Sequence, residues 1–140
     1  MNHDAHSKYA LPTLLVINNN DTKLVFDSSV LASFNQVYIS IREFSAILDW
    51  VQQYQPDLII LDMAWSKITN LQLIAALRLD WLTRNIPIMI ITGCNNQQIE
   101  SLGQLDYDAH LSKPYSAAEL GKKICSLVST PACETYNKIR

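Results

Sequence analysis

The sequence is poor in glycine, with 3 in 140 residues. Gly93, Gly103 and Gly121 are scattered, so the chain has no glycine-rich loop of the kind that lets a backbone approach a nucleotide phosphate. The segment from Asn18 to Thr22 offers no substitute. This absence argues against a flavin- or nucleotide-binding domain.

Cysteine is scarce as well: Cys94, Cys125 and Cys133 are the 3 present. Their number is odd, and no two of them have the C-x-x-C spacing. We therefore expect neither a disulfide framework nor a zinc site, and we expect a reducing compartment.

An excess of one charge and long apolar runs are also missing. Lys and Arg number 11 against 13 Asp and Glu, which gives a net charge of −2, and this balance does not suggest the basic patch that nucleic-acid binding needs. No apolar run approaches the ~18 residues that a membrane span needs. The polar start, Met1 to Ala10, has no apolar segment of the signal-peptide type. We expect a soluble, cytoplasmic protein that binds neither nucleic acid nor membrane.

Hydrophobic residues make up 49% of the chain, enough for the core of one domain. Three short runs are continuously apolar: Leu14–Ile17, Leu58–Leu61 and Ile88–Ile91. Such runs are typical of strands buried on both faces, as in a parallel sheet. Gln36–Ile39 and Ala109–Leu111 are weaker strand candidates.

Helical patterns alternate with these strands. Apolar residues at helical spacing predict helices over Phe44–Val51 and Leu71–Leu77. A late helix is expected to begin near Ser116 with a capping box. The segment after Asn20 and the segment Asn95–Leu105 are weaker helix candidates.

The order of elements, strand then helix five times, predicts an α/β domain. Its sheet should be parallel, with helices on both faces. We expect this domain to span residues 12–129, with loose tails at 1–11 and 130–140.

Polar residues follow the expected strands at their carboxyl ends, where sites form in open parallel sheets. They are Asn18, Asn19, Asp62, Thr92 and Lys113. A carboxylate, a hydroxyl and an ammonium group on one edge suit phosphoryl transfer, because the carboxylate can attack phosphorus while the others hold phosphoryl oxygens.

The order and spacing of three segments resemble the receiver domain of two-component response regulators. These segments are Leu58–Asp62, Asn85–Gly93 and Ala109–Tyr115, and the resemblance covers about Thr13 to Val128. It implies a flavodoxin-like fold: a doubly wound, five-stranded parallel sheet with helices on both faces.

The resemblance also implies residue roles. Asp62 falls where the family accepts a phosphoryl group from a histidine kinase or phosphotransfer protein. Thr92 matches the switch hydroxyl, and Lys113 matches the lysine that pairs with the phosphoryl group. His110 falls at the switch aromatic position, where Tyr or Phe is usual. The bond between Lys113 and Pro114 corresponds to one that is typically cis in the family.

The chain departs from the family at its metal site. The acidic pair that helps to hold Mg²⁺ is replaced by Asn18 and Asn19, which leaves Asp62 as the anionic ligand. Because Mg²⁺ prefers carboxylates, we expect its binding to be weakened or lost. The loop after Asp62 also has Ser66 and Asn70 where the family often has Pro and Gly.

The expected function is that of a stand-alone receiver domain in a phosphorelay, with output by contact with a downstream protein or by homodimerisation. It would not be an enzyme, beyond self-phosphorylation and dephosphorylation at Asp62. The alternative is a pseudo-receiver, an interaction module that works without phosphorylation. A third reading, an aspartate-nucleophile phosphatase, is weaker because Asp62-Met63-Ala64 lacks the second Asp of a D-x-D motif.

Overall fold

The computed structural model describes residues 11–18, 31–62, 67–93, 106–131 and 133–134. Several sequence expectations fall outside these ranges. They concern the N-terminal tail, the helix after Asn20, the helix over Asn95–Leu105, and the positions Asn19, Ser66 and Cys94.

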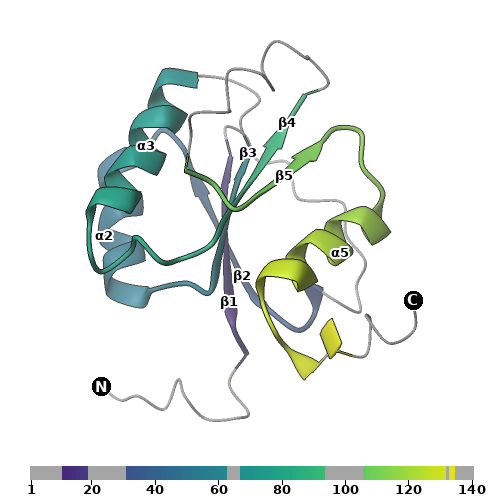
Figure 1. The fold of residues 1–140 in the computed structure, drawn as a ribbon. Coiled ribbons are helices and arrows are strands. Elements are labelled where there is room, and N and C mark those ends of the chain that lie inside the picture. Colours follow the sequence, from purple (N-terminus) through teal and green to yellow (C-terminus); the bar gives the residue numbers. More distant parts are fainter. Residues whose placement is uncertain (1–10, 19–30, 63–66, 94–105, 132, 135–140) are drawn as a thin grey trace.

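Five strands form one parallel sheet in the order β2-β1-β3-β4-β5 (Figure 1). All five expected strands are confirmed, and the order reverses between β1 and β3, as in doubly wound sheets of the flavodoxin type. The strands are β1 (Thr13–Asn18), β2 (Asn35–Ser40), β3 (Leu58–Asp62), β4 (Ile88–Thr92) and β5 (Ala109–Ser112).

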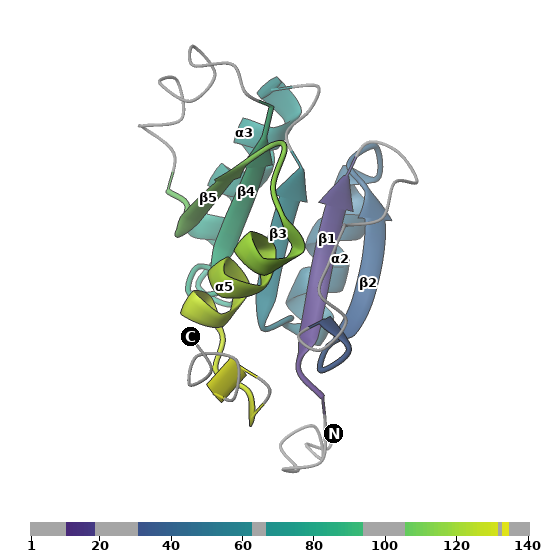
Figure 2. The same ribbon diagram turned by 90° about the vertical axis from the view of Figure 1, so that its right-hand side faces the viewer.

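Helices cover both faces of the sheet. The described helices are α2 (Phe44–Tyr54), α3 (Lys67–Leu79) and α5 (Ala117–Leu127). Figures 1 and 2 show α2 and α3 on one face and α5 on the other. The expected α/β architecture is therefore confirmed. No helix in the described part of the chain is long and apolar enough to cross a membrane.

The hydrophobic core has one layer on each face of the sheet. Strand β1 contributes side chains to both layers, which explains why apolar and polar residues do not alternate along it. Leu15 and Ile17 pack into the cluster that includes α2 and α3, whereas Leu14 and Val16 pack into the cluster beneath α5. All four side chains are 0% exposed. Successive side chains of a strand point to opposite faces, so a strand covered on both sides must be apolar throughout.

The capping box expected at the start of α5 is confirmed. The Ser116 hydroxyl accepts from the Glu119 amide at 3.0 Å, and the Glu119 carboxylate accepts from the Ser116 amide at 2.9 Å. Two amide groups that the helix itself cannot pair are thereby satisfied, which fixes where α5 begins after β5.

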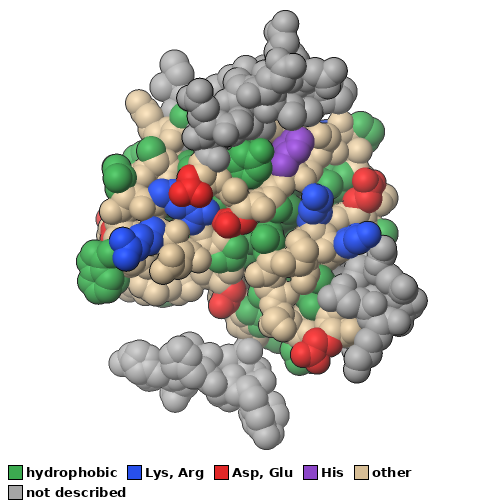
Figure 3. Space-filling view, viewed as in Figure 1, with side chains coloured by type: hydrophobic (Ala, Val, Ile, Leu, Met, Phe, Trp, Pro, Cys, Tyr) green, Lys and Arg blue, Asp and Glu red, His purple; other side chains and the backbone are tan. Residues whose placement is uncertain are grey.

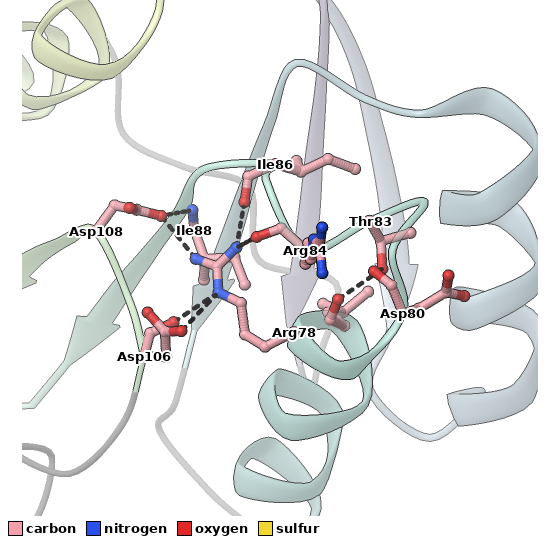
Figure 4. Close-up of polar contacts among 9 residues, drawn as sticks. Arg78, Asp80, Thr83, Arg84, Ile86, Ile88, Asp106 and Asp108 are labelled. Atoms are coloured by element: carbon pink, nitrogen blue, oxygen red, sulfur yellow. Dashed lines mark hydrogen bonds and ion pairs between the residues drawn. The ribbon is translucent and has the colours of Figure 1, made fainter.

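Arg78, near the end of α3, joins three separate segments (Figure 4). Its guanidinium donates to the carbonyls of Arg84, Ile86 and Asp106 at 2.7–2.9 Å. It also pairs with the Asp108 carboxylate at 2.7 Å. The loops that lead into β4 and β5 are thus fixed to α3 by one side chain, which places the start of both strands.

The sequence predicted no disulfide framework, but the structure holds one disulfide, which the cysteine count did not predict. Cys125 in α5 and Cys133 are bonded, with their Cα atoms 5.2 Å apart. An odd number of cysteines does not exclude a bond between two of them. Here the chain reverses after α5, which brings together two cysteines that are eight positions apart. Cys133 is 1% exposed and Thr130 is 5% exposed, so the first residues of the segment 130–140 pack against the domain.

Candidate functional site

Four of the five polar residues singled out in the sequence lie at the carboxyl edge of the sheet, and the fifth, Asn19, is outside the described residues. Asn18, Asp62 and Thr92 are the last residues of β1, β3 and β4, and Lys113 follows β5 directly. The parallel register pairs Asp62 with Ile91 and Thr92 with Ser112, so these strands end at the same level. This is the edge toward which the arrows of β1 and β3 point in Figure 2.

Asp62 and Lys113 contact each other although they are 51 positions apart. The Lys113 Nζ lies 3.0 Å from Oδ2 and 3.2 Å from Oδ1 of Asp62. The Asp62 side chain is 17% exposed and that of Lys113 is 41% exposed. The carboxylate is therefore sheltered and paired with a cation, yet the pair is still reachable from solvent.

The backbone around Lys113 explains how its side chain reaches this position. The Lys113 amide donates to the Thr92 carbonyl at 2.8 Å, which extends the pairing of β4 and β5 by one residue beyond the strands. The next peptide bond, Lys113–Pro114, is cis, as the resemblance implies.

Thr92 is buried, and its hydroxyl contacts His110 on the neighbouring strand. The distance from Thr92 Oγ1 to His110 Nε2 is 2.7 Å, and Ser112 Oγ lies 3.4 Å from the same nitrogen. The pKa of His110 is lowered below its ordinary value of 6.5, first by partial burial and then by the positive charge of Lys123. The ring is thus predominantly neutral near pH 7, and a neutral ring nitrogen can accept the hydroxyl proton of Thr92.

The sequence located Thr92 and His110 separately, but it did not reveal their contact or the nearby Ser112 and Lys123. The register of β4 and β5 carries that information, because it sets Ile90 opposite His110 and Thr92 opposite Ser112. Alternating apolar and polar residues can specify strand register, but β4 is buried at every position and so offers no such alternation.

Asn18 contributes an amide at the same edge and is 5% exposed. Its backbone carbonyl accepts from the Ile41 amide at 2.7 Å, which anchors the exit of β1 to the turn after β2. Asn19 lies outside the described residues. Within the described ranges, no group of three or more His, Cys, Asp or Glu side chains could hold a metal ion. The described donors are one carboxylate, already paired with Lys113, and one amide, whereas Mg²⁺ favours several oxygen ligands with negative charge.

One face of the molecule carries charges of both signs (Figure 3). In the view of Figure 3, basic and acidic side chains of the described residues are interspersed with apolar and polar ones. The pairing of Asp62 with Lys113 is a local contact, and short-range charge pairs of this kind are screened less by salt than distant charges are. A sheltered carboxylate, an ammonium at both of its oxygens and a nearby hydroxyl can together accept and hold a phosphoryl group.

Comparisons with known proteins identify a family. The family model of the response regulator receiver domain matches residues 14–125. A probable cyclic di-GMP phosphodiesterase of Vibrio cholerae serotype O1 is 26% identical over 113 residues, which are 80% of this chain and 25% of that protein. The polar-differentiation response regulator DivK of Brucella ovis is 23% identical over 105 residues, 74% of this chain and 85% of that protein. The chain thus spans a quarter of the first relative and most of the second.

A solved structure shows the same fold. The receiver domain of the sensor histidine kinase PA1611 from Pseudomonas aeruginosa is 17% identical, with a TM-score of 0.66. The match covers 84% of this chain and 98% of that domain. That domain has a magnesium ion coordinated in its active-site cleft.

Proposed function

Because the chain belongs to the response regulator receiver domain family, we propose that Asp62 accepts a phosphoryl group in two-component signalling. The double contact of Lys113 with the Asp62 carboxylate supports this role most directly. Lys113 brings its charge to the group that would become phosphorylated, and the sheet edge holds Thr92 and Asn18 nearby on neighbouring strands. A carboxylate that served only as a structural ion pair would not need these polar strand ends around it.

The proposed reaction is a displacement at phosphorus. A carboxylate oxygen of Asp62 attacks the phosphoryl group of a phosphohistidine donor, the P–N bond breaks, and the imidazole leaves. The product is a mixed acyl phosphate, which makes the site more negative. Lys113 offsets part of that charge, and the hydroxyl of Thr92 can donate to a phosphoryl oxygen once it leaves His110.

We also propose that Mg²⁺ binds more weakly here than in receivers with an acidic pair. Mg²⁺, when bound, neutralises phosphoryl charge. Among the described residues Asp62 and Asn18 would hold it, and Asn18 supplies an oxygen but no negative charge. Phosphorylation should therefore be slow and should need high Mg²⁺ concentrations.

The test is to incubate the protein with phosphoramidate, with and without Mg²⁺, and to record its intact mass. A phosphoryl adduct is expected in the wild type and not in Asp62→Ala. Asp57→Asn is the matched control, because Asp57 lies at the opposite end of β3, where its carboxylate accepts from the Thr13 amide. Lys113→Ala should slow adduct formation by about 10- to 100-fold, if a hydrogen bond to a charged group contributes about 1.5–3 kcal/mol.

The result that would reject this proposal is an unmodified wild type under conditions that modify an ordinary receiver. An adduct that persists in Asp62→Ala would also reject it, because the phosphoryl group would then sit on another residue. An adduct that forms equally well without Mg²⁺ would leave Asp62 as the acceptor but would leave no role for the metal.

A second function, the pseudo-receiver, is favoured by two observations. The site has an amide at Asn18, and the Thr92 hydroxyl is already bonded to His110. In that case the folded domain would bind its protein partner, or a second copy, in one fixed conformation. Amide hydrogen exchange at the edge of the sheet should then be the same with and without phosphoramidate, whereas a working receiver should change at β4 and β5.

We further propose a cytoplasmic location and output by protein contact. The donor would be a histidine kinase or phosphotransfer protein, since these carry the phosphohistidine that the reaction consumes. Any catalytic activity would be confined to phosphorylation and dephosphorylation of Asp62 itself.

A further inference from the structure

The two bonded cysteines differ in their access to solvent. Cys125 lies on α5 and is partly buried, whereas Cys133 is 1% exposed and belongs to the core cluster beneath α5. Leu120 and Ile124, in the same cluster, are 0% exposed. A reagent in solution can therefore reach the sulfur of Cys125 more readily than that of Cys133, and thiol–disulfide exchange depends strongly on such access.

The local sequence after α5 brings the cysteines together. The helix ends at Leu127, and Val128 adopts an extended conformation. Thr130 then begins a new turn: its hydroxyl accepts from the Cys133 amide at 3.0 Å, and its carbonyl accepts from the Glu134 amide at 2.9 Å. Pro131 fits the first position of such a turn. These bonds do not involve sulfur, so the turn can place Cys133 near Cys125 before any cross-link forms.

The separation of 5.2 Å between the two Cα atoms is within the range that a disulfide spans without moving the backbone. Both sulfur atoms belong to one short segment, so the cross-link needs no change in the sheet or in the carboxyl edge. The pair is also separate from the candidate phosphoryl site, which lies on Asp62, Thr92 and Lys113 at the ends of the strands.

We propose that Cys125 and Cys133 are a reversible dithiol–disulfide pair that reacts with low-molecular-weight disulfides such as oxidised glutathione. The Cys125 thiolate attacks the external disulfide, forming a mixed disulfide and releasing one thiol. The Cys133 thiol then loses its proton and attacks the Cys125 sulfur, which releases the second thiol. In total, two protein thiols and one external disulfide give one protein disulfide and two external thiols, and reductant reverses both steps.

The cross-link ties the turn at residues 130–134 to α5. In the disulfide form, Cys133 cannot leave the core cluster without moving the helix. In the dithiol form, the turn keeps the hydrogen bonds of Thr130 with the amides of Cys133 and Glu134, but it has no covalent link to α5. Oxidation therefore makes the end of the domain more rigid, and reduction lets it open locally. In a reducing compartment such a pair would close under oxidative conditions only.

The test uses the full chain, first reduced and then incubated with oxidised glutathione, followed by alkylation with iodoacetamide and tryptic digestion. Ile124–Lys138 is one tryptic peptide that contains both cysteines. From the oxidised protein, this peptide should carry no alkyl group. Its mass should be lower than that of the unalkylated dithiol peptide by two hydrogen atoms. The peptide that contains Cys94 should not be cross-linked to this peptide, and Cys94→Ser should not change the result.

Two variants test the order of the steps. With Cys133→Ala, Cys125 should accumulate a glutathione adduct, because the resolving thiol is missing. With Cys125→Ser, Cys133 should remain largely free of glutathione, because it is buried. The second variant alters a partly exposed position, so the proposal stays testable if the substitution at Cys133 impairs folding.

Amide hydrogen exchange supplies the conformational readout. The amides of Cys133 and Glu134 should exchange more slowly in the oxidised protein than in the reduced protein. Three results would overturn the proposal: both cysteines still alkylated after oxidation, a cross-link to Cys94, or equal exchange of these amides in the two states.

Discussion

Replacing Arg78 with methionine should destabilise the domain by about 2–4 kcal/mol, because its guanidinium holds two loops against α3. The side chain of Arg78 is 12% exposed, and methionine keeps most of its apolar length. The substitution therefore removes the hydrogen bonds and the charge with little change in packing. The carbonyls of Arg84, Ile86 and Asp106 and the Asp108 carboxylate lose a donor.

The magnitude follows from how exposed each acceptor is. The bond to the Ile86 carbonyl, at 2.7 Å, is partly buried, and a bond with a charged donor contributes about 1.5–3 kcal/mol. The other acceptors are exposed, with the Asp106 and Asp108 side chains at 79% and 42%. Solvent screens these contacts, so each adds a few tenths of a kcal/mol up to about 1. Asp108 keeps its bond from the Ile88 amide, at 2.8 Å, which limits the loss.

Urea unfolding under reducing conditions measures this loss. For m of about 2 kcal/mol per molar urea, the midpoint should fall by about 1–2 M with little change in m. Arg84→Met is the matched control, because Arg84 contributes its carbonyl and its side chain is exposed. That variant should stay within about 0.5 kcal/mol of the wild type. If the two variants unfold at the same midpoint, the guanidinium contacts do not stabilise the fold as argued.

Four further predictions concern other parts of the domain. Ser116→Ala removes the capping box of α5 and should reduce the unfolding free energy by about 0.5–2 kcal/mol, measured in urea. Ile60→Ala empties a fully buried position in the central strand and should cost about 2–5 kcal/mol in the same assay. Partial burial, then Lys123, lowers the folded pKa of His110 below 6.5, so the unfolded state takes up a proton first as the pH falls. The contribution of neutral His110 to the unfolding free energy should be fully present above pH 6.5 and should decline as the pH falls toward the folded pKa. Unfolding curves recorded across that range should show this decline for the wild type and not for His110→Gln. Asn18→Asp places a carboxylate at the end of β1, on the same sheet edge as Asp62, so under the proposed function Mg²⁺ should raise the melting temperature of this variant more than that of the wild type.

Much of the fold could be predicted because its strongest signals are local. The runs Leu14–Ile17, Leu58–Leu61 and Ile88–Ile91 are apolar on both faces, and helical spacing separates them. Together these patterns indicate a sheet covered on both sides. The capping box at Ser116 is likewise contained within four consecutive residues. Each of these features depends on neighbours in the sequence, so one sequence is enough to predict it.

The features that were missed depend on contacts between distant segments. Arg78 satisfies carbonyls in two loops, and nothing in the pattern around it distinguishes it from an exposed helical arginine. The bond between Cys125 and Cys133 depends on the chain reversal at Thr130. The sequence Thr130-Pro131 is a turn signal, but the prediction from the number of cysteines did not consider it. For the same reason the contact of Thr92 with His110 could not be predicted without the register of the last two strands.

The geometry of the site indicates which step should limit phosphorylation. If the Thr92 hydroxyl donates to the His110 ring nitrogen, it must leave that nitrogen before it can donate to a phosphoryl oxygen, which costs about 0.5–1.5 kcal/mol for a neutral hydrogen bond. The charge-assisted bond that replaces it contributes about 1.5–3 kcal/mol, so this exchange is favourable. Charge is the greater obstacle. Lys113 already neutralises Asp62, and the added phosphoryl charge finds an amide at Asn18 where a metal-binding carboxylate would help. Under the proposed function, the exchange at Thr92 is therefore compatible with phosphorylation of Asp62, and we expect the missing negative charge at the end of β1 to set the barrier.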